Sequence, residues 1–240
     1  MTTKTWIITG VSQGFGRELA LSALRSGDAV VAAVRRPESV ADIASANPDR
    51  FSAVTFDVRD TAAAPGVVEY ALERFGRIDV LVNNAGRGMV GAAEMVDDST
   101  LRDLMELHLI GPAALVRAVL PSMRVQGSGT IVQMSSQGGR MSFPGVGAYS
   151  ASKFALEGWS EALAGEVAQF GVRVMIVEPS RFRTAFNTPG VLSFAESSSE
   201  YRDLLDPVLR DMAAADGVQE GDPEKASNDQ NLWMVLGEAA

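Results

Sequence analysis

The stretch "TGVSQGFG", residues 9–16, decides the fold of this chain. It follows the apolar run "TWIIT" (5–9) and precedes a segment whose apolar residues recur at helical spacing. Gly10, Gly14 and Gly16 allow a tight turn and let backbone N–H groups approach a pyrophosphate closely. A glycine-rich turn between a first strand and a first helix therefore predicts a dinucleotide site, although the glycines alone also fit a turn that binds nothing.

Apolar runs of strand length alternate with helical patterns along most of the chain. The runs cover residues 5–9, 29–34, 51–56, 78–82, 130–135 and 172–178. Because they are continuously apolar rather than alternating, they are predicted to be buried on both faces, as in a parallel sheet covered by helices. We therefore predict an α/β fold with a doubly wound, Rossmann-like parallel sheet, in a single domain spanning residues 1–240.

Residues 185–222 show no pattern of a central strand. Within them, "SSSEYRDLLDPVLRDMAAADG" (197–217) predicts a serine-capped helix that Pro207 interrupts. This region follows the last long strand, so we expect it to cover the carboxyl edge of the sheet, where open α/β folds bind ligands. The apolar side chains expected to line a substrate pocket there are Met89, Met141, Phe143, Phe186, Leu192 and Phe194.

Composition and charge exclude several classes of function. The chain has no cysteine, which excludes disulfides, thiolate nucleophiles and cysteine–metal sites and suits a reducing compartment. A net charge of −9 argues against nucleic acid or an anionic membrane as a partner. No apolar run approaches the ~18–20 residues of a membrane span, and the chain enters its first strand without room for a signal peptide. We predict a cytoplasmic protein, and no metal site is predicted.

The end of the second strand reads "VRRPE" (34–38). In dinucleotide-binding proteins a carboxylate at this point binds the ribose 2′-hydroxyl of NAD, whereas arginine accommodates the 2′-phosphate of NADP. Arg35 and Arg36 stand there in this chain, and guanidinium groups bind phosphate with charge-assisted hydrogen bonds. The pattern favours NADP(H) over NAD(H), with two ordinary surface charges as the alternative.

"YSASK" (149–153) places Tyr149 and Lys153 four residues apart in a helical pattern, so both lie on one helix face. An ammonium ~5 Å from a phenol, at an effective dielectric constant of ~20, lowers the phenol pKa by up to ~2. That brings the phenol toward the range of a general acid or base near neutral pH. Upstream, Ser135 and Ser136 close the preceding strand at the same edge of the sheet.

Six motifs in order, "TGVSQGFG", "FDV" (56–58), "NNAG" (83–86), "MSS" (134–136), "YSASK" and "VEPSRFRT" (177–184), carry a resemblance. The chain resembles the short-chain dehydrogenase/reductase superfamily over almost all of its length. The resemblance implies hydride transfer between a nicotinamide and a carbonyl or alcohol carbon, with Tyr149 as the general acid or base. Ser136 would orient the substrate oxygen, and Lys153 would lower the tyrosine pKa and hold the nicotinamide ribose.

The motifs and the resemblance together give a set of expected cofactor contacts. They are Thr9, Gly10, Ser12, Gly14, Phe15, Gly16, Arg35, Arg36, Asp57, Val58, Asn83, Ala85, Gly86, Lys153, Pro179 and Thr184. Of the two serines, Ser136 is favoured because Ser135 lies one residue too far from Tyr149 for the family's spacing. The lining of the expected pocket suggests a hydrophobic ketone, aldehyde or secondary alcohol as the small-molecule substrate.

The chain departs from the family at His108, which in "HLIG" (108–111) stands where the family has asparagine. In the family, the backbone carbonyl of that residue holds a water that connects the lysine to solvent. Three interpretations stay open: a tolerated replacement with the relay intact, impaired catalysis, or an imidazole that itself carries protons. The second of these supports a rival function, an NADP(H)-binding regulator or sensor with weak or lost turnover. A structural protein without cofactor would leave the glycine turn unexplained.

Two further departures concern a loop and the C-terminus. Ser180 stands where the family commonly has glycine, so the loop beside the nicotinamide is open to displacement. Between Pro223 and the strand-like "LWMVLG" (232–237) there are too few residues for a full helix. Relatives often form a dimer through this part of the chain, so a homo-oligomer, either a dimer or a tetramer, stays open.

Overall fold

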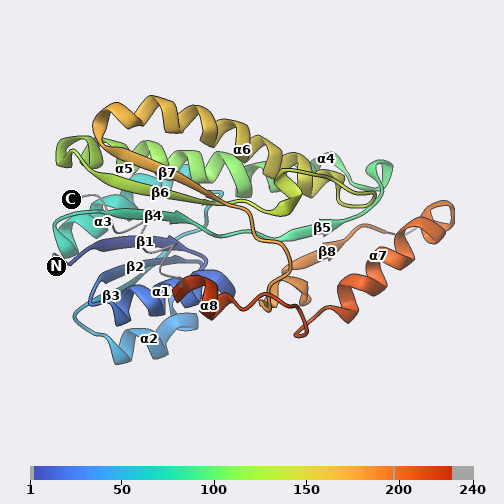
Figure 1. Ribbon diagram of the computed structural model, residues 1–240, viewed down its shortest axis with the longest axis horizontal. Coiled ribbons are helices and arrows are strands. Elements are labelled where there is room, and N and C mark those ends of the chain that lie inside the picture. The colour runs from blue at the N-terminus through green and yellow to red at the C-terminus, as the bar shows by residue number, and fades with distance from the viewer. Residues whose placement is uncertain (1–2, 197, 229–240) are drawn as a thin grey trace.

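The structure, a computed structural model, describes residues 3–196 and 198–228 and is built on a six-stranded parallel sheet (Figure 1). The strand order is β3–β2–β1–β4–β6–β7. The strands are β1 Thr5–Thr9, β2 Ala29–Val34, β3 Phe51–Thr55, β4 Val80–Asn83, β6 Gly129–Met134 and β7 Val172–Val177. The order runs outward in both directions from β1 and β4, so the predicted doubly wound sheet is confirmed. All six predicted strands exist, with ends within two residues of those expected.

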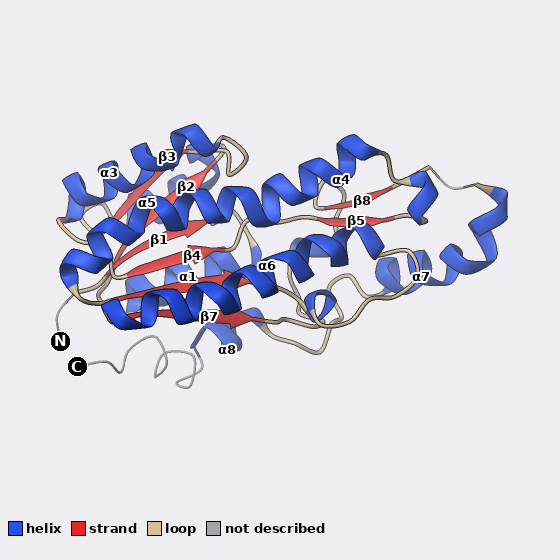
Figure 2. Cartoon of the chain, turned by 90° about the horizontal axis from the view of Figure 1, so that it is seen from above, coloured by secondary structure: helices blue, strands red, loops and turns tan. Residues whose placement is uncertain are grey.

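Helices cover both faces of this sheet. They are α1 Gly14–Arg25, α2 Ala41–Ala46, α3 Ala64–Phe75, α4 Asp98–Met105, α5 Gly111–Gln126, α6 Gly147–Val167, α7 Arg202–Ala214 and α8 Pro223–Asn228. Figure 2 shows α3, α5 and α6 in front of the sheet and α1 with its neighbour α8 behind it. Helices on both faces explain why the strands are apolar on both sides.

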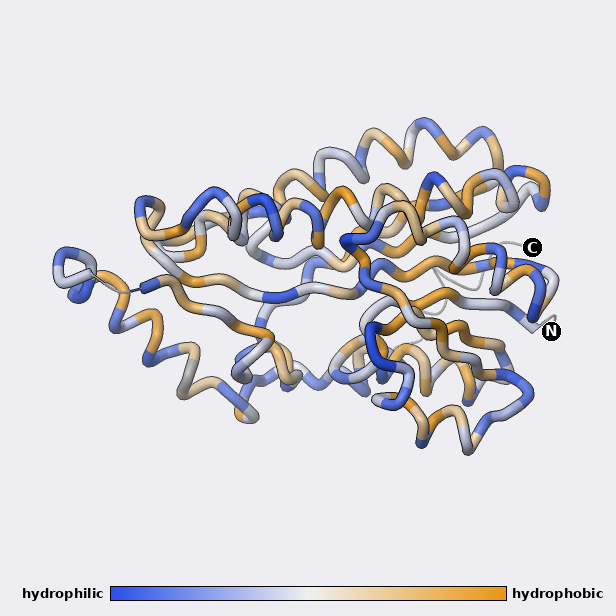
Figure 3. The backbone as a smooth tube through the Cα atoms, turned by 180° about the vertical axis from the view of Figure 1, so that it is seen from behind, coloured by the Kyte–Doolittle hydropathy of each residue, from blue (hydrophilic) through white to orange (hydrophobic). Residues whose placement is uncertain are grey.

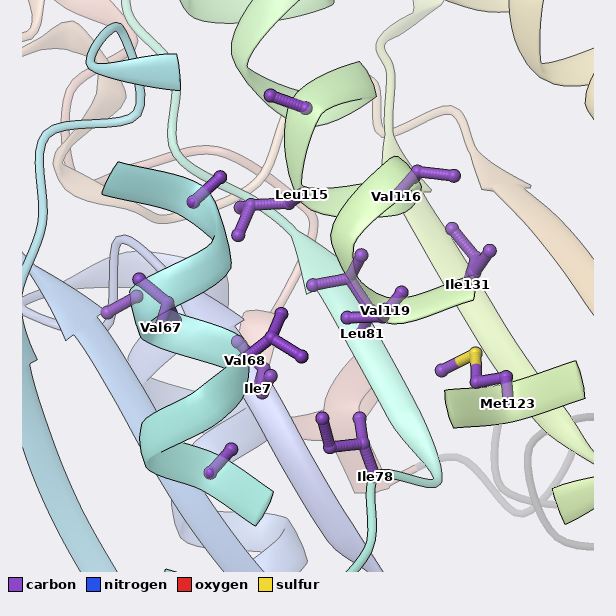
Figure 4. Close-up of a cluster of buried hydrophobic side chains, with 14 of the residues drawn as sticks. Ile7, Val67, Val68, Ile78, Leu81, Leu115, Val116, Val119, Met123 and Ile131 are labelled. Atoms are coloured by element: carbon purple, nitrogen blue, oxygen red, sulfur yellow. The ribbon is translucent and has the colours of Figure 1, made fainter. Parts of the chain in front are cut away.

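The two faces of the sheet form two separate hydrophobic clusters. On one face Ile7, Leu81 and Ile131 pack against α3 and α5, with Val68 and Leu115 among the contacts (Figure 4). On the other face Trp6 and Ile8 pack against Leu19, Leu24 and further α1 and α2 side chains. Alternate residues of β1 thus point to opposite clusters, as the two-residue period of a strand requires. Each fully buried side chain of this size contributes about 1.5–3 kcal/mol to stability.

A smaller unit lies beyond the carboxyl ends of the strands. There β5, Gly88–Val90, pairs in parallel with β8, Leu192–Phe194, and α7 continues from them; the three project from the carboxyl edge of the main sheet in Figure 1. Residues 185–222 thus contain no central strand, as expected, but they do contain β8, which the sequence did not reveal. Three residues that pair about a hundred positions away leave no local pattern.

The predicted interruption at Pro207 is wrong. Helix α7 runs from Arg202 to Ala214 through Pro207, and apolar and polar residues alternate along it in Figure 3. Proline removes one helical hydrogen bond, normally made to the carbonyl four residues earlier, at Asp203. Both residues are exposed, so water can satisfy that carbonyl. The serine cap is also wrong: a 3₁₀ turn, Ser199–Tyr201, precedes α7, and Ser198 before it makes no side-chain capping bond.

The C-terminal helix α8 is six residues long, as short as the sequence suggested. The strand-like "LWMVLG" (232–237) lies outside the described residues.

One long helical run joins α4 and α5 through a π-helical turn, Glu106–Ile110. Within the described part of the chain, this run, Asp98–Gln126, is the one helix long and apolar enough to cross a membrane. Half of its most apolar window is buried inside the fold. It is therefore weak evidence for a membrane span.

Candidate active site

A cavity of about 950 Å³ opens at the carboxyl edge of the main sheet. It is lined by the segments that follow β1, β2, β3, β4, β6 and β7, and by residues from 184 to 219. Its volume is at the upper end of the range of ligand sites, and its position is where doubly wound sheets bind ligands. The expectation that residues 185–222 cover this edge is confirmed.

The turn after β1 forms one end of the cavity. Gly10 and Gly14 adopt left-handed φ angles of 72° and 58°, which side chains with a Cβ rarely take. Gln13, the N-cap of α1, makes no side-chain capping bond, so the N–H groups of the first helical turn stay available for an anion. Gly10, Ser12, Gly14 and Phe15 line the cavity as expected.

Gly16 has a packing role instead. A Cβ at this position would lie 2.5 Å from both Asn84 Nδ2 and the Gly10 carbonyl oxygen, and Gly16 does not line the cavity.

Two other expected cofactor contacts, Thr9 and Asn83, do not line the cavity either. The Thr9 hydroxyl accepts hydrogen bonds from the backbone N–H groups of Asn84 and Ala85 at 2.9 and 3.0 Å, and so ties β1 to the end of β4. Asn83 donates to Gln133 Oε1 at 3.0 Å inside the sheet. The neighbouring Asn84 does line the cavity, because successive strand residues point to opposite sides.

The remaining expected contacts lie where the sequence put them. The cavity lining contains Arg35, Arg36, Asp57, Val58, Ala85, Gly86, Lys153, Pro179 and Thr184.

Around Asp57 the structure adds a charged network that the sequence did not reveal. Arg59 donates to both oxygens of Asp57, at 3.0 and 2.6 Å, and to Asp103 at 2.7 Å. Arg59 therefore lowers the pKa of Asp57 to about 2, with Arg35 contributing a smaller charge effect. Asp103 also accepts from Arg87 at 2.6 Å, and Arg87 donates to the Ser193 hydroxyl in β8 at 3.2 Å. These contacts join the loop after β3 to β8.

Ser136, Tyr149 and Lys153 meet inside this cavity. Ser136 Oγ accepts from the Gly138 N–H at 3.0 Å, and a Cβ on Gly138 would lie 3.0 Å from the Tyr149 ring, so the loop holds serine and tyrosine together. Lys153 Nζ donates to the Met134 carbonyl at 2.8 Å and lies 6.0 Å from the centroid of the Tyr149 ring. Ser135, the less favoured serine, also lines the cavity, but it is buried and its hydroxyl lies beside the Glu157 carboxyl.

The pKa of the Tyr149 phenol lies above its ordinary value, because burial disfavours the phenolate and a hydrogen bond with Ser136 offsets only part of this effect. The direction is opposite to the one expected from Lys153. Burial also lowers the pKa of Lys153 to about 8, and the charge of Glu157 raises it in part. At neutral pH the phenol is therefore protonated and the amine is mostly charged.

His108 is buried in the π-helical turn and contacts two residues near Tyr149 and Lys153, namely Ser152 on α6 and Arg87, which precedes β5. Its Nδ1 lies 2.7 Å from the Ser152 hydroxyl, which donates to the Tyr149 carbonyl at 2.6 Å. Its Nε2 accepts from the Arg87 backbone N–H at 3.2 Å. This network assigns the proton to Nδ1. Burial, with the charges of Lys153 and Arg87, holds the pKa of His108 well below its ordinary value, so the imidazole is neutral.

Ser180 does not strain the loop that follows β7. It has a negative φ, because among the described residues only glycines have positive φ angles. Its hydroxyl donates to Gln137 Oε1 at 2.8 Å, and the Gln137 N–H donates to the Pro179 carbonyl at 2.9 Å. The loop is thus anchored to the segment that carries Ser136.

Four of the six apolar residues expected in the pocket line the cavity, namely Met89, Phe143, Phe186 and Leu192. The other two, Met141 and Phe194, are exposed to 45% and 53% and do not line it. The Phe186 ring lies 5.9 Å from the Tyr149 ring, which brings the apolar wall next to the reacting groups. Val90, Val146, Val191 and Met212 complete this wall. In the described residues no group of three His, Asp or Glu side chains is placed to hold a metal.

Comparison with known proteins agrees with this geometry. The model of the short chain dehydrogenase family matches residues 4–191. The chain belongs to the short-chain dehydrogenase family. It is 36% identical to oxidoreductase BOA17 of Botryotinia fuckeliana over 237 residues, covering 98% of this chain and 85% of that protein.

Solved structures show the same relationship. A short-chain dehydrogenase from Streptomyces avermitilis superposes with a TM-score of 0.90 at 47% identity, over 98% of this chain and 85% of that one. A short-chain dehydrogenase/reductase from Burkholderia phymatum, solved in complex with NAD, superposes with a TM-score of 0.85 at 24% identity, over 97% of this chain and 86% of that one. This short-chain dehydrogenase is accordingly an oxidoreductase with a nucleotide-binding fold.

Proposed function

We propose that this short-chain dehydrogenase transfers a hydride between NADP(H) and a carbonyl or secondary-alcohol carbon, with Tyr149 as general acid or base. The observation that carries the proposal is the meeting of Ser136, Tyr149 and Lys153 in one cavity with the glycine turn after β1. The NAD complex of the structurally similar Burkholderia protein supports a nicotinamide cofactor.

The residues of the cavity fit a dinucleotide along its length. Gly10, Gly14 and the uncapped start of α1 would hold the pyrophosphate. Asp57 and Val58 would contact the adenine, and Arg35 and Arg36 the 2′-phosphate. At the other end, Lys153 would bind the nicotinamide ribose, while Pro179 and Thr184 would face the carboxamide.

Gly86 packs against two residues of the proposed site. A Cβ on Gly86 would lie 3.2 Å from His108 Nε2, which is tighter than most side-chain contacts, and 3.8 Å from Lys153 Nζ, which is an ordinary contact distance.

When bound, the nicotinamide supplies or accepts the hydride. The chain's own residues handle the proton and the orientation of the substrate. The Tyr149 phenol is protonated at neutral pH because burial raises its pKa, so in reduction it can donate its proton to the substrate oxygen. Ser136 orients that oxygen with its hydroxyl. The Lys153 ammonium, held by the Met134 carbonyl, stabilises the phenolate that remains.

For His108 we favour the first of the three interpretations, a tolerated replacement with the relay intact, because the imidazole is neutral. A neutral imidazole with both nitrogens engaged cannot add an ionisation near neutral pH. We expect His108→Asn to keep turnover within about threefold, and its pH profile to match that of the wild type. His108→Leu should lose about tenfold or more, because Ser152 and the Arg87 N–H lose buried partners at a cost of ~1–3 kcal/mol.

The measurement is kcat and kcat/KM from pH 5 to 9 for both variants, with thermal unfolding as the control for folding. An ionisation near pH 6.5 in the wild type that disappears in His108→Asn would show that the imidazole does carry protons.

The apolar wall favours a hydrophobic substrate, and no partner beyond the small molecule is required. The test is a titration of NADPH and NADH by fluorescence, followed by assays on a panel of aliphatic, aromatic and polycyclic ketones and aldehydes. We expect tight NADPH binding and turnover on at least one of the apolar substrates. NADPH binding without turnover on any of them would instead support the rival function, a cofactor-binding regulator or sensor.

A further inference from the structure

A buried carboxyl group lies directly behind the catalytic lysine. Glu157 is on α6, one helical turn after Lys153, and is only 4% exposed. Its carboxyl oxygens make no well-formed hydrogen bond within the described residues, although the Ser135 hydroxyl lies beside the carboxyl and favours its charged form. A carboxyl group buried in this way is costly, since a leucine or methionine would fill the same space without the desolvation penalty. Its presence at this position therefore calls for a role other than packing.

The neighbours of Glu157 are the residues that carry the active-site loop. Ser135, next to Ser136, is buried, and its hydroxyl lies beside the Glu157 carboxyl. A Cβ on Gly139 would lie 2.6 Å from Ser135 Oγ and 2.9 Å from Glu157 Oε1. Only glycine at position 139 leaves room for this contact. The carboxyl group thus lies against the loop that ends β6 and positions Ser136.

The charges that face Glu157 come from three elements. Lys153 and Glu161 lie one turn before and after it on α6, Arg140 follows the active-site loop, and Glu178 directly follows β7. Arg140 lies 3.9 Å from Glu157, 3.2 Å from Glu161 and 3.7 Å from Glu178, so one guanidinium is shared by three carboxylates. Of these three, only Glu157 is buried.

The two buried charges on α6 act on each other. Burial lowers the pKa of Lys153, and the charge of Glu157 offsets part of this effect. Burial also raises the pKa of Glu157, and the Ser135 hydroxyl and, to a smaller extent, the charge of Arg140 oppose this shift. Removal of the carboxylate would therefore leave a lysine that loses its proton at lower pH, together with a loop that has lost a contact.

We propose that Glu157 is a positioning residue of this active site: its carboxylate keeps the ammonium of Lys153 charged and supports the loop that carries Ser136. The proposal rests on the proposed function, since Lys153 matters only if Tyr149 and the nicotinamide ribose depend on it. It gives a role to a third residue of the same helix, one turn after the lysine and two turns after the tyrosine.

The test compares Glu157→Gln with Glu161→Gln. Both variants remove one carboxylate that faces Arg140, but only the first removes the buried one. For Glu157→Gln we expect the alkaline limb of kcat/KM to move down by about 1 pH unit and turnover at pH 8 to fall about tenfold. Glu161→Gln should leave the alkaline limb where it is in the wild type. Glu157→Asp, which keeps the charge, should show only part of the shift seen in Glu157→Gln.

A second readout does not depend on turnover. We would measure the affinity for NADPH by fluorescence as the pH is raised from 6 to 9. In Glu157→Gln the affinity should begin to fall at a lower pH than in the wild type, because Lys153 faces the ribose. If Glu157→Gln and Glu161→Gln show the same pH dependence of kcat/KM and of NADPH affinity, the proposal is overturned. This holds also if Glu157→Gln is less stable than the wild type. Turnover that survives in Tyr149→Phe would instead show that the proposed function itself is wrong.

Discussion

Tyr149→Phe should lower kcat for carbonyl reduction by ~10²–10⁴-fold, which is what proton transfer by a positioned side chain contributes to a rate. The phenol is the group beside which both Ser136 and Lys153 lie. Burial keeps the phenol protonated at neutral pH, so its hydroxyl is in the form that reduction requires. Phenylalanine keeps the ring and removes only the proton donor.

The variant tests chemistry rather than folding. The ring contacts of Tyr149 with His108 and Phe186, at centroid distances of 5.6 and 5.9 Å, do not involve the hydroxyl and are retained. We therefore expect the Kd for NADPH to stay within about twofold of the wild type. Kinetics under single-turnover conditions separate the hydride step from product release. A kcat within tenfold of the wild type would show that another group delivers the proton.

The residues proposed for catalysis can be predicted from the sequence because their signal is local. Tyr149 and Lys153 are one helical turn apart, and the glycine turn directly follows a strand, so each pattern states its own geometry. The sheet can also be predicted from the sequence, since continuously apolar strands separated by helical patterns are compatible with only a few sheet topologies. The sequence alone does not always show which of two adjacent residues faces the cavity, and Asn83 is an example. It ends β4 facing Gln133, while Asn84 faces the cavity.

Contacts between distant elements could not be predicted in this way. Arg59 is 44 residues from Asp103, and Arg87 is 106 residues from Ser193, so no window of sequence contains either pair. The pairing of β5 with β8 has the same origin. The predicted direction of the Tyr149 pKa shift is wrong for a different reason. The prediction considered the charge of Lys153 but not the burial of the phenol, and burial has the larger effect. The neutral state of His108 likewise depends on its surroundings.

The second large effect concerns the choice of cofactor. A variant with both Arg35→Ala and Arg36→Ala is expected to weaken NADPH binding by ~10²–10³-fold and to leave NADH binding within about threefold. Each lost charge-assisted hydrogen bond to the 2′-phosphate costs ~1.5–3 kcal/mol. Both side chains are exposed at the cavity, so they are free to move onto a phosphate, and neither carries the fold.

The neighbourhood of these arginines explains why the effect should be specific to the phosphate. Arg59 pairs with both oxygens of Asp57, the carboxylate that follows β3, and Arg35 acts on this carboxylate only through a smaller charge effect. The matched control is Arg102→Ala on α4, which removes a positive charge outside the cavity lining and so tests the general field. Titrations at two salt concentrations give both Kd values. Equal affinity of the wild type for NADPH and NADH, or an equal loss of both in the double variant, would mean that the two arginines do not read the 2′-phosphate.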